Sequence, residues 1–233
     1  VGMTFLPREG DPRRASENAV EVATAQQQLK FLGWRNVPVN PPAIGMLSRQ
    51  VMPVIKQFFI GATDSMVGKD FEKKLYLIRK EAEKIVTELA KAREQPAFQD
   101  FYVCSLSAKT VVYKGLVMAK QLRDFYPDLS DESTATCFAI VHLRFSTNTL
   151  GSWKLAHPYR MIAHNGEINT IRGNRNWMAA RETTLKSVLF GESMRRMADI
   201  CEQETSDTAS FDNVFELLYM GGRSIEHAMS MMI

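Results

Sequence analysis

A long amphipathic helix is the feature of this sequence that most restricts its fold. Between residues 69 and 94, apolar side chains recur at alternating intervals of four and three with Lys and Glu between them: Phe71, Leu75, Ile78, Ala82, Ile85 and Leu89. Such a stripe must be covered by another apolar surface. A coiled-coil seam is one possible cover, but the repeat is short and Ala82 is a weak member. Docking on a neighbouring sheet is therefore the favoured prediction.

Shorter elements are predicted around this helix. Strands are expected at 1–6, 34–39, 101–107, 110–113 and 137–143, a further apolar stretch at 51–60, and helices at 17–32, 120–126, 170–186, 209–220 and after Ser224. Ser16 is expected to cap the first helix and Gly33 to end it. The 137–143 segment is apolar on both sides, which predicts a strand buried on both faces. The mixture indicates an α+β class built from local hairpins rather than regular βαβ units.

The composition is typical of a globular protein and argues against several classes of partner. The 233 residues can bury the core of one domain. The net charge of +3 is too small to indicate a nucleic-acid partner or an anionic membrane surface. No apolar run approaches the ~20 residues that a membrane span requires. Three widely spaced cysteines, Cys104, Cys137 and Cys201, form no CxxC pair, which favours free thiols in a reducing compartment of the cytoplasmic type. Cys104 and Cys137 lie in apolar, strand-like runs, where a thiol behaves as a small hydrophobe.

Both ends of the chain are expected to be cuts through a longer protein. The sequence opens on a strand-like run from Val1 to Leu6 without an initiator Met. It closes on an apolar helical run from Ala228 to Ile233 that has no Gly, Asn or basic last turn to stop it.

Residues 142–182 contain most of the side chains that suggest chemistry. Arg144, at a predicted strand end, offers a planar guanidinium that can grip a carboxylate at two points. Asn165-Gly166 offers a side-chain amide beside a backbone N–H that no Cβ shields, which suits a developing oxyanion. Asp207, farther along the chain, could hold an ammonium group.

Each of these residues also has an ordinary structural explanation. Asn-Gly between the short apolar runs 161–164 and 167–168 is a common type I′ hairpin signal. Asp207 could be the N-cap of the helix at 209–220, and Arg144 a surface cation. The histidines follow no zinc-ligand spacing and are interpreted as ordinary strand or loop residues: His142, His157 and His164.

The longer motifs resemble one family. RFSTNT at 144–149, HNGEINTIRGNRNWM at 164–178 and SDTASFDNV at 206–214 are similar to the glutamine-hydrolysing domain of glutamate synthase, a class II, N-terminal-nucleophile glutamine amidotransferase. Weaker similarity extends over most of the chain. The resemblance implies a four-layer αββα sandwich, of which residues 1–233 would be a partial glutamine amidotransferase type-2 domain, incomplete at its N-terminus.

The resemblance also implies roles for five residues. Arg144 would bind the carboxylate of L-glutamine, Thr147 would contact the substrate, and Asp207 would bind its ammonium group. The side chain of Asn165 and the N–H of Gly166 would form the oxyanion hole. The family's nucleophile is an N-terminal cysteine whose own α-amino group serves as the base. This chain begins with Val1, so alone it is expected to be inactive.

For the intact protein, the resemblance implies a synthase region of the same chain that converts 2-oxoglutarate to glutamate with FMN and an iron–sulfur cluster. The ligands of these cofactors are not expected in this chain. Electrons would come from a small subunit or from ferredoxin, and the protein would be cytoplasmic or plastid. Two alternatives stay open: another class II amidotransferase, and a non-catalytic glutamine-binding module that lacks the cysteine.

Overall fold

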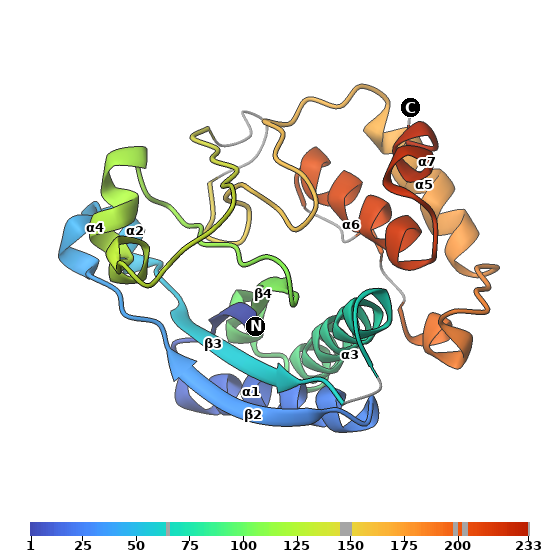
Figure 1. Cartoon of the computed structure of the whole chain (residues 1–233), viewed down its shortest axis with the longest axis horizontal. Coiled ribbons are helices and arrows are strands. Elements are labelled where there is room, and N and C mark those ends of the chain that lie inside the picture. Colours follow the sequence, from blue (N-terminus) through green and yellow to red (C-terminus); the bar gives the residue numbers. More distant parts are fainter. Residues whose placement is uncertain (64–65, 145–150, 198–199, 202–204, 233) are drawn as a thin grey trace.

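One antiparallel sheet lies at the centre of the fold. The computed structural model describes residues 1–63, 66–144, 151–197, 200–201 and 205–232. Four strands pair in the order β2-β3-β1-β4, with bounds β1 Gly2–Leu6, β2 Lys30–Asn36, β3 Val54–Gly61 and β4 Tyr102–Leu106. β1 pairs with β3 on one side and β4 on the other, so the first strand of the chain is internal to the sheet (Figure 1). The predicted α+β class is confirmed.

Two helices cover one face of this sheet. α1 (Gly10–Gln26) and α3 (Lys69–Arg93) contact each other and share one apolar core with the strands. That core includes Leu6, Ala19, Val20, Phe58, Ile60, Leu75, Ile78, Ala82 and Val103. Asp70 and Glu72 in the first turn of α3 and Lys91 and Arg93 in its last turn complement the helix dipole. The predicted helix at 69–94 and its docking on a sheet are confirmed.

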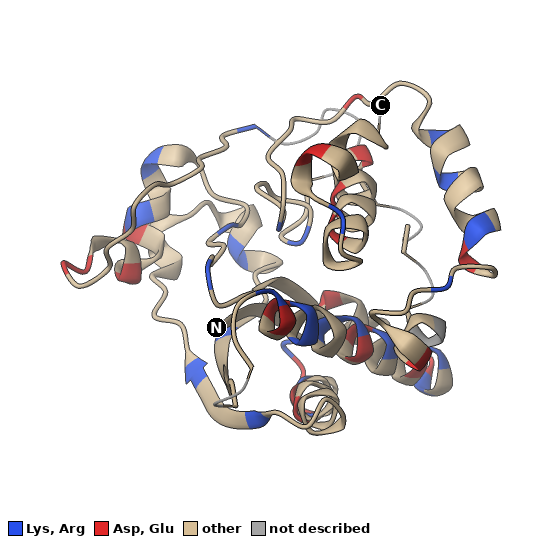
Figure 2. Cartoon of the chain, turned by 45° about the vertical axis from the view of Figure 1, so that its right-hand side comes forward, with Lys and Arg blue, Asp and Glu red and all other residues tan. Residues whose placement is uncertain are grey.

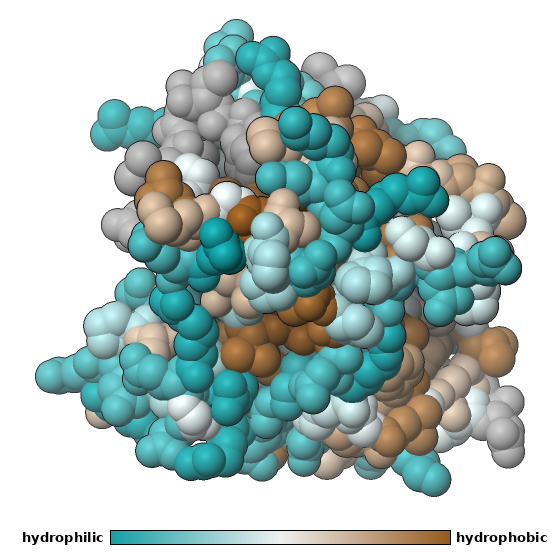
Figure 3. Space-filling view, turned by 90° about the vertical axis from the view of Figure 1, so that its left-hand side faces the viewer, coloured by the Kyte–Doolittle hydropathy of each residue, from teal (hydrophilic) through white to brown (hydrophobic). Residues whose placement is uncertain are grey.

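The opposite face of the sheet is covered by loops and short helices. Because side chains alternate along a strand, Met3 and Phe5 of β1 point to this second core while Leu6 points to the first. The cover includes α2 (Met46–Gln50) and α4 (Leu122–Phe125) at the left of Figure 1. On this side of the molecule, hydrophobic residues reach the surface among hydrophilic ones (Figure 3).

A third group of helices packs on the far side of α3. α5 (Ile171–Glu182), α6 (Asp207–Met220) and α7 (Ile225–Ser230) lie together at the right of Figure 1. Tyr76 and Leu77 of α3 share an apolar cluster with Phe190, Met197 and Leu217. α3 is therefore buried on both sides, by the sheet and by α6.

Short 3-10 helices complete the described secondary structure: η1 Pro41–Ala43, η2 Pro96–Asp100, η3 Ala119–Gln121, η4 Pro127–Ser130 and η5 Gly191–Arg196. Of the helices in the described ranges, none combines the length and apolar character needed to cross a membrane.

The prediction for the first helix was wrong at both ends. α1 begins at Gly10 and ends at Gln26, so Ser16 lies inside it and donates its hydroxyl hydrogen bond to the Pro12 carbonyl at 2.8 Å. Pro12 is tolerated because it sits in the first helical turn, where N–H groups have no intrahelical partner. Gly33 belongs to β2, at a register shift against β3 where its φ of +135° favours glycine.

Three predicted strand regions are also wrong. No strand forms at 110–113; the Val112 N–H donates to the Ser105 hydroxyl of β4 at 3.0 Å rather than to its backbone. Residues 137–143 form no strand, and Phe138 and Ile140 are 70% and 63% exposed instead of buried. The runs 161–164 and 167–168 do not pair either. The backbone N–H groups of Met161, Ile162 and Ile168 donate to carboxylates of α6, which replaces a hairpin ladder.

Replacing Ile78 with alanine is expected to lower the free energy of unfolding by about 2–5 kcal/mol, because the side chain is fully buried between α3 and the sheet. Lys84→Ala on the same helix is the matched control, since that side chain is 38% exposed and its ion pair with Glu88 spans 3.9 Å. Urea unfolding of the two variants would measure the difference. Equal losses would contradict the packing of α3 described above.

Candidate functional site

The Asn165-Gly166 turn lies against the beginning of α6. The Thr208 hydroxyl donates to the His164 carbonyl at 3.0 Å, and the Ile168 N–H donates to the Asp207 carboxylate at 3.1 Å. These two bonds bracket the turn. Gly166 has a φ of +95°, which favours glycine, and its N–H donates to Nδ1 of His164 at 3.2 Å. The structure therefore brings together three of the predicted site residues: Asn165, Gly166 and Asp207.

Asp207 is not the cap of α6. The N-cap is Ser206, whose hydroxyl accepts the Ala209 N–H at 3.1 Å. Asp207 occupies the first turn, where a negative charge is favoured by the helix dipole. Its other carboxylate oxygen lies 3.7 Å from the Arg175 guanidinium of α5. The capping explanation for Asp207 is thus wrong, and the side chain is available to hold the turn and a cation.

Arg144 lines a small cavity that the Asn165-Gly166 turn does not border. It is exposed at the end of the irregular 137–143 segment and borders a cavity of about 100 Å³ together with Lys114, His142 and His157. Among the described residues, Arg144 forms no hydrogen bond or ion pair that would occupy its guanidinium. The structure does not place it in contact with Asn165 or Asp207. Thr147 lies outside the described residues.

A row of aromatic rings connects the cavity beside Arg144 with the start of α6. The rings of His142 and His157 lie 4.5 Å apart, and His157 meets Tyr159 edge-on at 4.9 Å. The Tyr159 hydroxyl lies 2.7 Å from the hydroxyl of Ser206, the cap of α6. No group of three potential metal ligands occurs in the described portion of the chain.

The His157 ring is held neutral by its surroundings. Burial lowers its pKa to about 4, assisted by the positive charge that neighbouring His142, Lys114 and His164 can carry. In the unfolded chain the ring titrates near its ordinary value of 6.5 and binds the proton more readily. The free energy of unfolding should therefore decrease as pH falls from 6.5 to about 4.

In the His157→Gln variant this pH dependence should be weaker, because the titrating ring is gone. Urea midpoints measured at several pH values across that interval would show it. The slope of the urea midpoint against pH is compared, rather than the midpoint itself, because the substitution also changes the packing of a buried side chain. Identical slopes in both proteins would mean that His157 does not carry the proton linkage.

The cysteines differ from one another in environment. Cys104 is fully buried in the second core, and burial raises the pKa of its thiol to about 11. A thiol with a raised pKa is a poor nucleophile at neutral pH. Cys137 is exposed, which corrects the prediction that it lies in a buried strand.

Several side chains at this site were not predicted from the sequence. Tyr159 connects the loop to the cap of α6, and Asp212 accepts hydrogen bonds from the backbone before the turn. A signal for Asp212 was present, because it follows Thr208 by four residues and therefore lies on the same side of the helix. No local pattern marks Tyr159.

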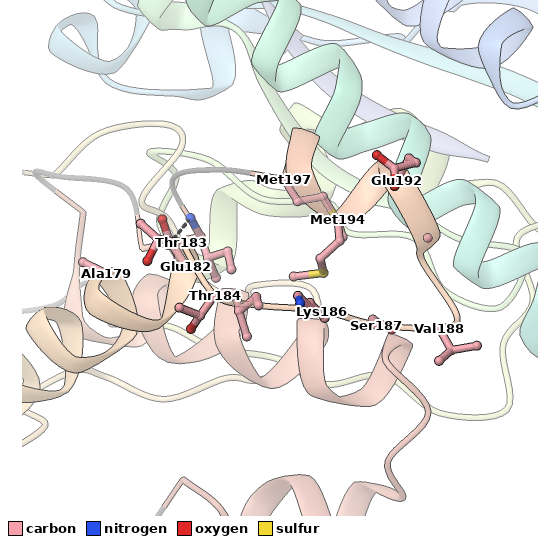
Figure 4. Close-up of a pocket in the computed structure, with 13 residues that line it drawn as sticks. Ala179, Glu182, Thr183, Thr184, Lys186, Ser187, Val188, Glu192, Met194 and Met197 are labelled. Atoms are coloured by element: carbon pink, nitrogen blue, oxygen red, sulfur yellow. Dashed lines mark hydrogen bonds between the residues drawn. The ribbon is translucent and has the colours of Figure 1, made fainter.

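The cavity shown in Figure 4 is separate from the Asn165-Gly166 turn. It measures about 720 Å³ and is bordered by the end of α5, the 183–188 loop and η5. Met194 and Met197 lie on its wall, and Glu182 accepts the Ile200 N–H at 2.8 Å. The predicted site residues are not among those that line this cavity.

Comparison with known proteins identifies the family. The family model described as glutamine amidotransferases class-II matches residues 1–233. The chain belongs to the class II glutamine amidotransferases. This membership confirms the resemblance that the RFSTNT, HNGEINTIRGNRNWM and SDTASFDNV motifs carry.

The curated relatives of this amidotransferase chain are large glutamate synthases. It is 44% identical over 235 residues to the glutamate synthase [NADPH] large chain of Bacillus subtilis (strain 168), covering 100% of this chain and 15% of that protein. It is 41% identical over 234 residues to the Azospirillum brasilense large chain, with the same coverage. The chloroplastic ferredoxin-dependent glutamate synthase of Oryza sativa subsp. japonica is 39% identical over 233 residues, 14% of its length. The chain thus spans about one seventh of these relatives.

Proposed function

We propose that this amidotransferase chain is the glutamine-hydrolysing part of a glutamate synthase. The observation that carries the proposal is the attachment of the Asn165-Gly166 turn to the first turn of α6, where Asp207 lies. An oxyanion donor and an ammonium acceptor belong to one small site in an enzyme that hydrolyses a free amino acid amide. Family membership and about 40% identity to glutamate synthase large chains support the same substrate, L-glutamine.

A few residues carry out the steps of the proposed reaction. A cysteine thiolate at the N-terminus of the mature longer protein adds to the amide carbonyl of glutamine, and its α-amino group accepts the thiol proton. Asn165 and the Gly166 N–H stabilise the oxyanion, so the Gly166 N–H exchanges its bond to His164 for one to the substrate. The intermediate releases ammonia with the transferred proton, and water then cleaves the thioester to give glutamate.

Charged side chains are proposed to bind the α-carboxylate and the α-ammonium group of the substrate. Arg144 binds the α-carboxylate, for which its guanidinium is free among the described residues, and Thr147 adds a contact. Asp207, in the first turn of α6, binds the α-ammonium. Binding glutamine between these groups requires Arg144 to approach the turn. The rings of His142, His157 and Tyr159 lie between the two regions, and the Tyr159 hydroxyl reaches Ser206 at the start of α6.

We propose that the complete domain is an αββα sandwich. The described residues supply one sheet with α1 and α3 on one face. The exposed apolar side chains of Phe138, Ile140, Val141 and Leu143 support a second sheet in the longer protein. Pairing of 137–143 with strands outside this chain would bury them and would place Arg144 at a strand end.

The synthase chemistry is proposed for the remainder of the protein. FMN would supply electrons for the reduction of 2-oxoglutarate with ammonia, and an iron–sulfur cluster would deliver them from ferredoxin or a small subunit. The described residues here do not fit such a cluster, because Cys104 is sealed in the core and no group of metal ligands is assembled. A location in the cytoplasm, or in a plastid for a ferredoxin-dependent form, fits this function.

The proposal is tested by determining the first residue of the mature longer protein by mass spectrometry of its N-terminal peptide. Cysteine is the expected result. A different residue, combined with glutamine binding but no ammonia release, would instead support a non-catalytic glutamine-binding module. Ammonia delivered to an acceptor other than 2-oxoglutarate would indicate another class II amidotransferase.

A further inference from the structure

A buried cluster of charged residues joins α3, α6 and the loop that precedes the Asn165-Gly166 turn. Figure 2 shows Lys and Arg alternating with Asp and Glu along α3. Arg79 of α3 pairs with Glu83 at 2.8 Å and with Glu216 of α6. Burial alone would raise the pKa of Glu83, but Arg79, Lys80 and Arg160 outweigh it and lower that pKa to about 2. Glu83 is therefore charged at neutral pH, whereas burial raises the pKa of Glu216.

Asp212 of α6 is the member that touches the loop backbone. It is fully buried, and one of its carboxylate oxygens accepts the N–H groups of Met161 at 2.7 Å and Ile162 at 3.1 Å. The other oxygen accepts the Arg160 N–H at 3.3 Å. Three successive backbone donors thus converge on one carboxylate. An acceptor with this geometry fixes the position of the backbone because unmade buried hydrogen bonds are costly.

Arg160 provides the counter-charge that such a buried carboxylate needs. Its guanidinium lies 3.7 Å from Asp212 and 3.5 Å from Glu83, and it donates to the Val103 carbonyl of β4 at 2.8 Å. The same group lies over the ring of Tyr102 at 5.0 Å. Asp212 and Arg160 therefore attach the loop to both α6 and the sheet.

The position of Asp212 along α6 connects it to the proposed oxyanion turn. Thr208 holds the His164 carbonyl, and Asp212, one helical turn later, holds the backbone of Met161 and Ile162. With Asp207 holding Ile168, the first two turns of α6 fix the chain before and after Asn165-Gly166. Loss of the bonds between Asp212 and the backbone of Met161 and Ile162 would let the turn move relative to the substrate.

We propose that Asp212 is a positioning residue for glutamine hydrolysis, which sets the place of the Asn165-Gly166 donors by holding residues 160–162 on α6. This inference rests on the proposed glutaminase function. Asp212 does not touch the substrate in this account, so its loss should act on the transition state through the misplaced oxyanion donors. A shift of about 1 Å in such groups can lower the rate by about 10²-fold.

The test compares Asp212→Ala, Asp212→Asn and Leu217→Ala in the longer protein. Leu217 is the control, because it is also buried on α6 but packs in the apolar cluster with Tyr76 and Phe190, away from the charged cluster. Reactive sites are counted with an electrophilic glutamine analogue that alkylates the nucleophilic cysteine, so kcat refers only to competent enzyme. Amide hydrogen exchange of residues 160–162 gives a readout that is independent of activity.

Asp212→Ala should lower kcat per reactive site by about 10²-fold with a smaller change in KM, and should speed exchange at 160–162. Asp212→Asn keeps one acceptor oxygen, so its kcat and its exchange rate at 160–162 should lie between those of wild type and Asp212→Ala. Leu217→Ala should leave kcat per site and exchange at 160–162 unchanged, even where it lowers stability. Unchanged kcat per site in Asp212→Ala, or unchanged exchange at 160–162, would overturn the positioning role. Wild-type protein without glutaminase activity would refute the proposed function instead, while the exchange experiment would still test the attachment.

Discussion

Replacement of Asn165 with alanine is expected to lower kcat for glutamine hydrolysis by about 10²–10³-fold in the longer protein. The side-chain amide is one of the two proposed oxyanion donors, and the removal of one such donor typically costs this much. KM should change much less, because the negative charge on the oxygen develops only in the transition state. Ammonia release under saturating glutamine measures the effect directly.

Asn169→Ala is the matched control for this substitution. Asn169 is the same residue type, exposed, and four positions farther along the same segment. It should retain nearly full activity. If both variants kept wild-type turnover, Asn165 would have no catalytic role, and its Asn-Gly pair would be explained by turn formation alone.

Removal of the Arg144 side chain should act on binding. Arg144→Ala is expected to weaken glutamine binding by about 2–5 kcal/mol, or roughly 30- to 4,000-fold in Kd, because the substrate carboxylate loses its charged partner. Titration calorimetry on protein whose nucleophilic cysteine has been replaced would measure affinity without turnover. Glutamine analogues without the α-carboxylate should show little difference between wild type and variant.

Two further variants test whether the loss of glutamine affinity is specific to the guanidinium of Arg144. Arg144→Lys keeps the charge but not the planar fork, so it should lie between wild type and alanine. Arg123→Ala removes an exposed arginine of α4 and should bind glutamine normally. Equal affinity of Arg144→Ala and Arg123→Ala would return Arg144 to the role of a surface cation.

Periodicity in the sequence predicted the elements whose partners lie within this chain. The stripe from Phe71 to Leu89 specified α3 because a long amphipathic face has few ways to be covered. The strand at 1–6 and the helix after Ser224 were also predicted, the latter confirmed by a hydrogen bond from the His227 N–H to the Ser224 hydroxyl. In these cases local preference and tertiary packing agree.

The failures arise where distant groups decide the local structure. The Asn-Gly segment matches a hairpin signal, yet the carboxylates of Asp207 and Asp212 bind the N–H groups that a hairpin would pair. The apolar run at 137–143 is strand-like, but no described strand pairs with it and its side chains remain exposed. Ser16 has the chemistry of a cap, but α1 begins six residues earlier than its position.

The structure places only some residues of the predicted site close to one another. Asn165, Gly166 and Asp207 were predicted as one site and lie together around the start of α6. Arg144 was assigned to the same site, and its approach to them remains a prediction. The supporting residues Tyr159 and Arg160 were not anticipated, since their roles depend on contacts with Ser206 and Asp212 that lie about fifty residues away in the sequence.

The most direct test of glutamine hydrolysis is the release of ammonia from glutamine labelled with ¹⁵N at the side-chain amide, by the longer protein that carries this chain. With 2-oxoglutarate withheld, so that ammonia is not consumed, equal amounts of labelled ammonia and glutamate are expected, and Asn165→Ala should release about 10²–10³-fold less. Glutamine binding with no labelled ammonia from the wild-type protein would contradict the proposed hydrolysis. That outcome would leave residues 142–182 as part of a binding site without the proposed chemistry.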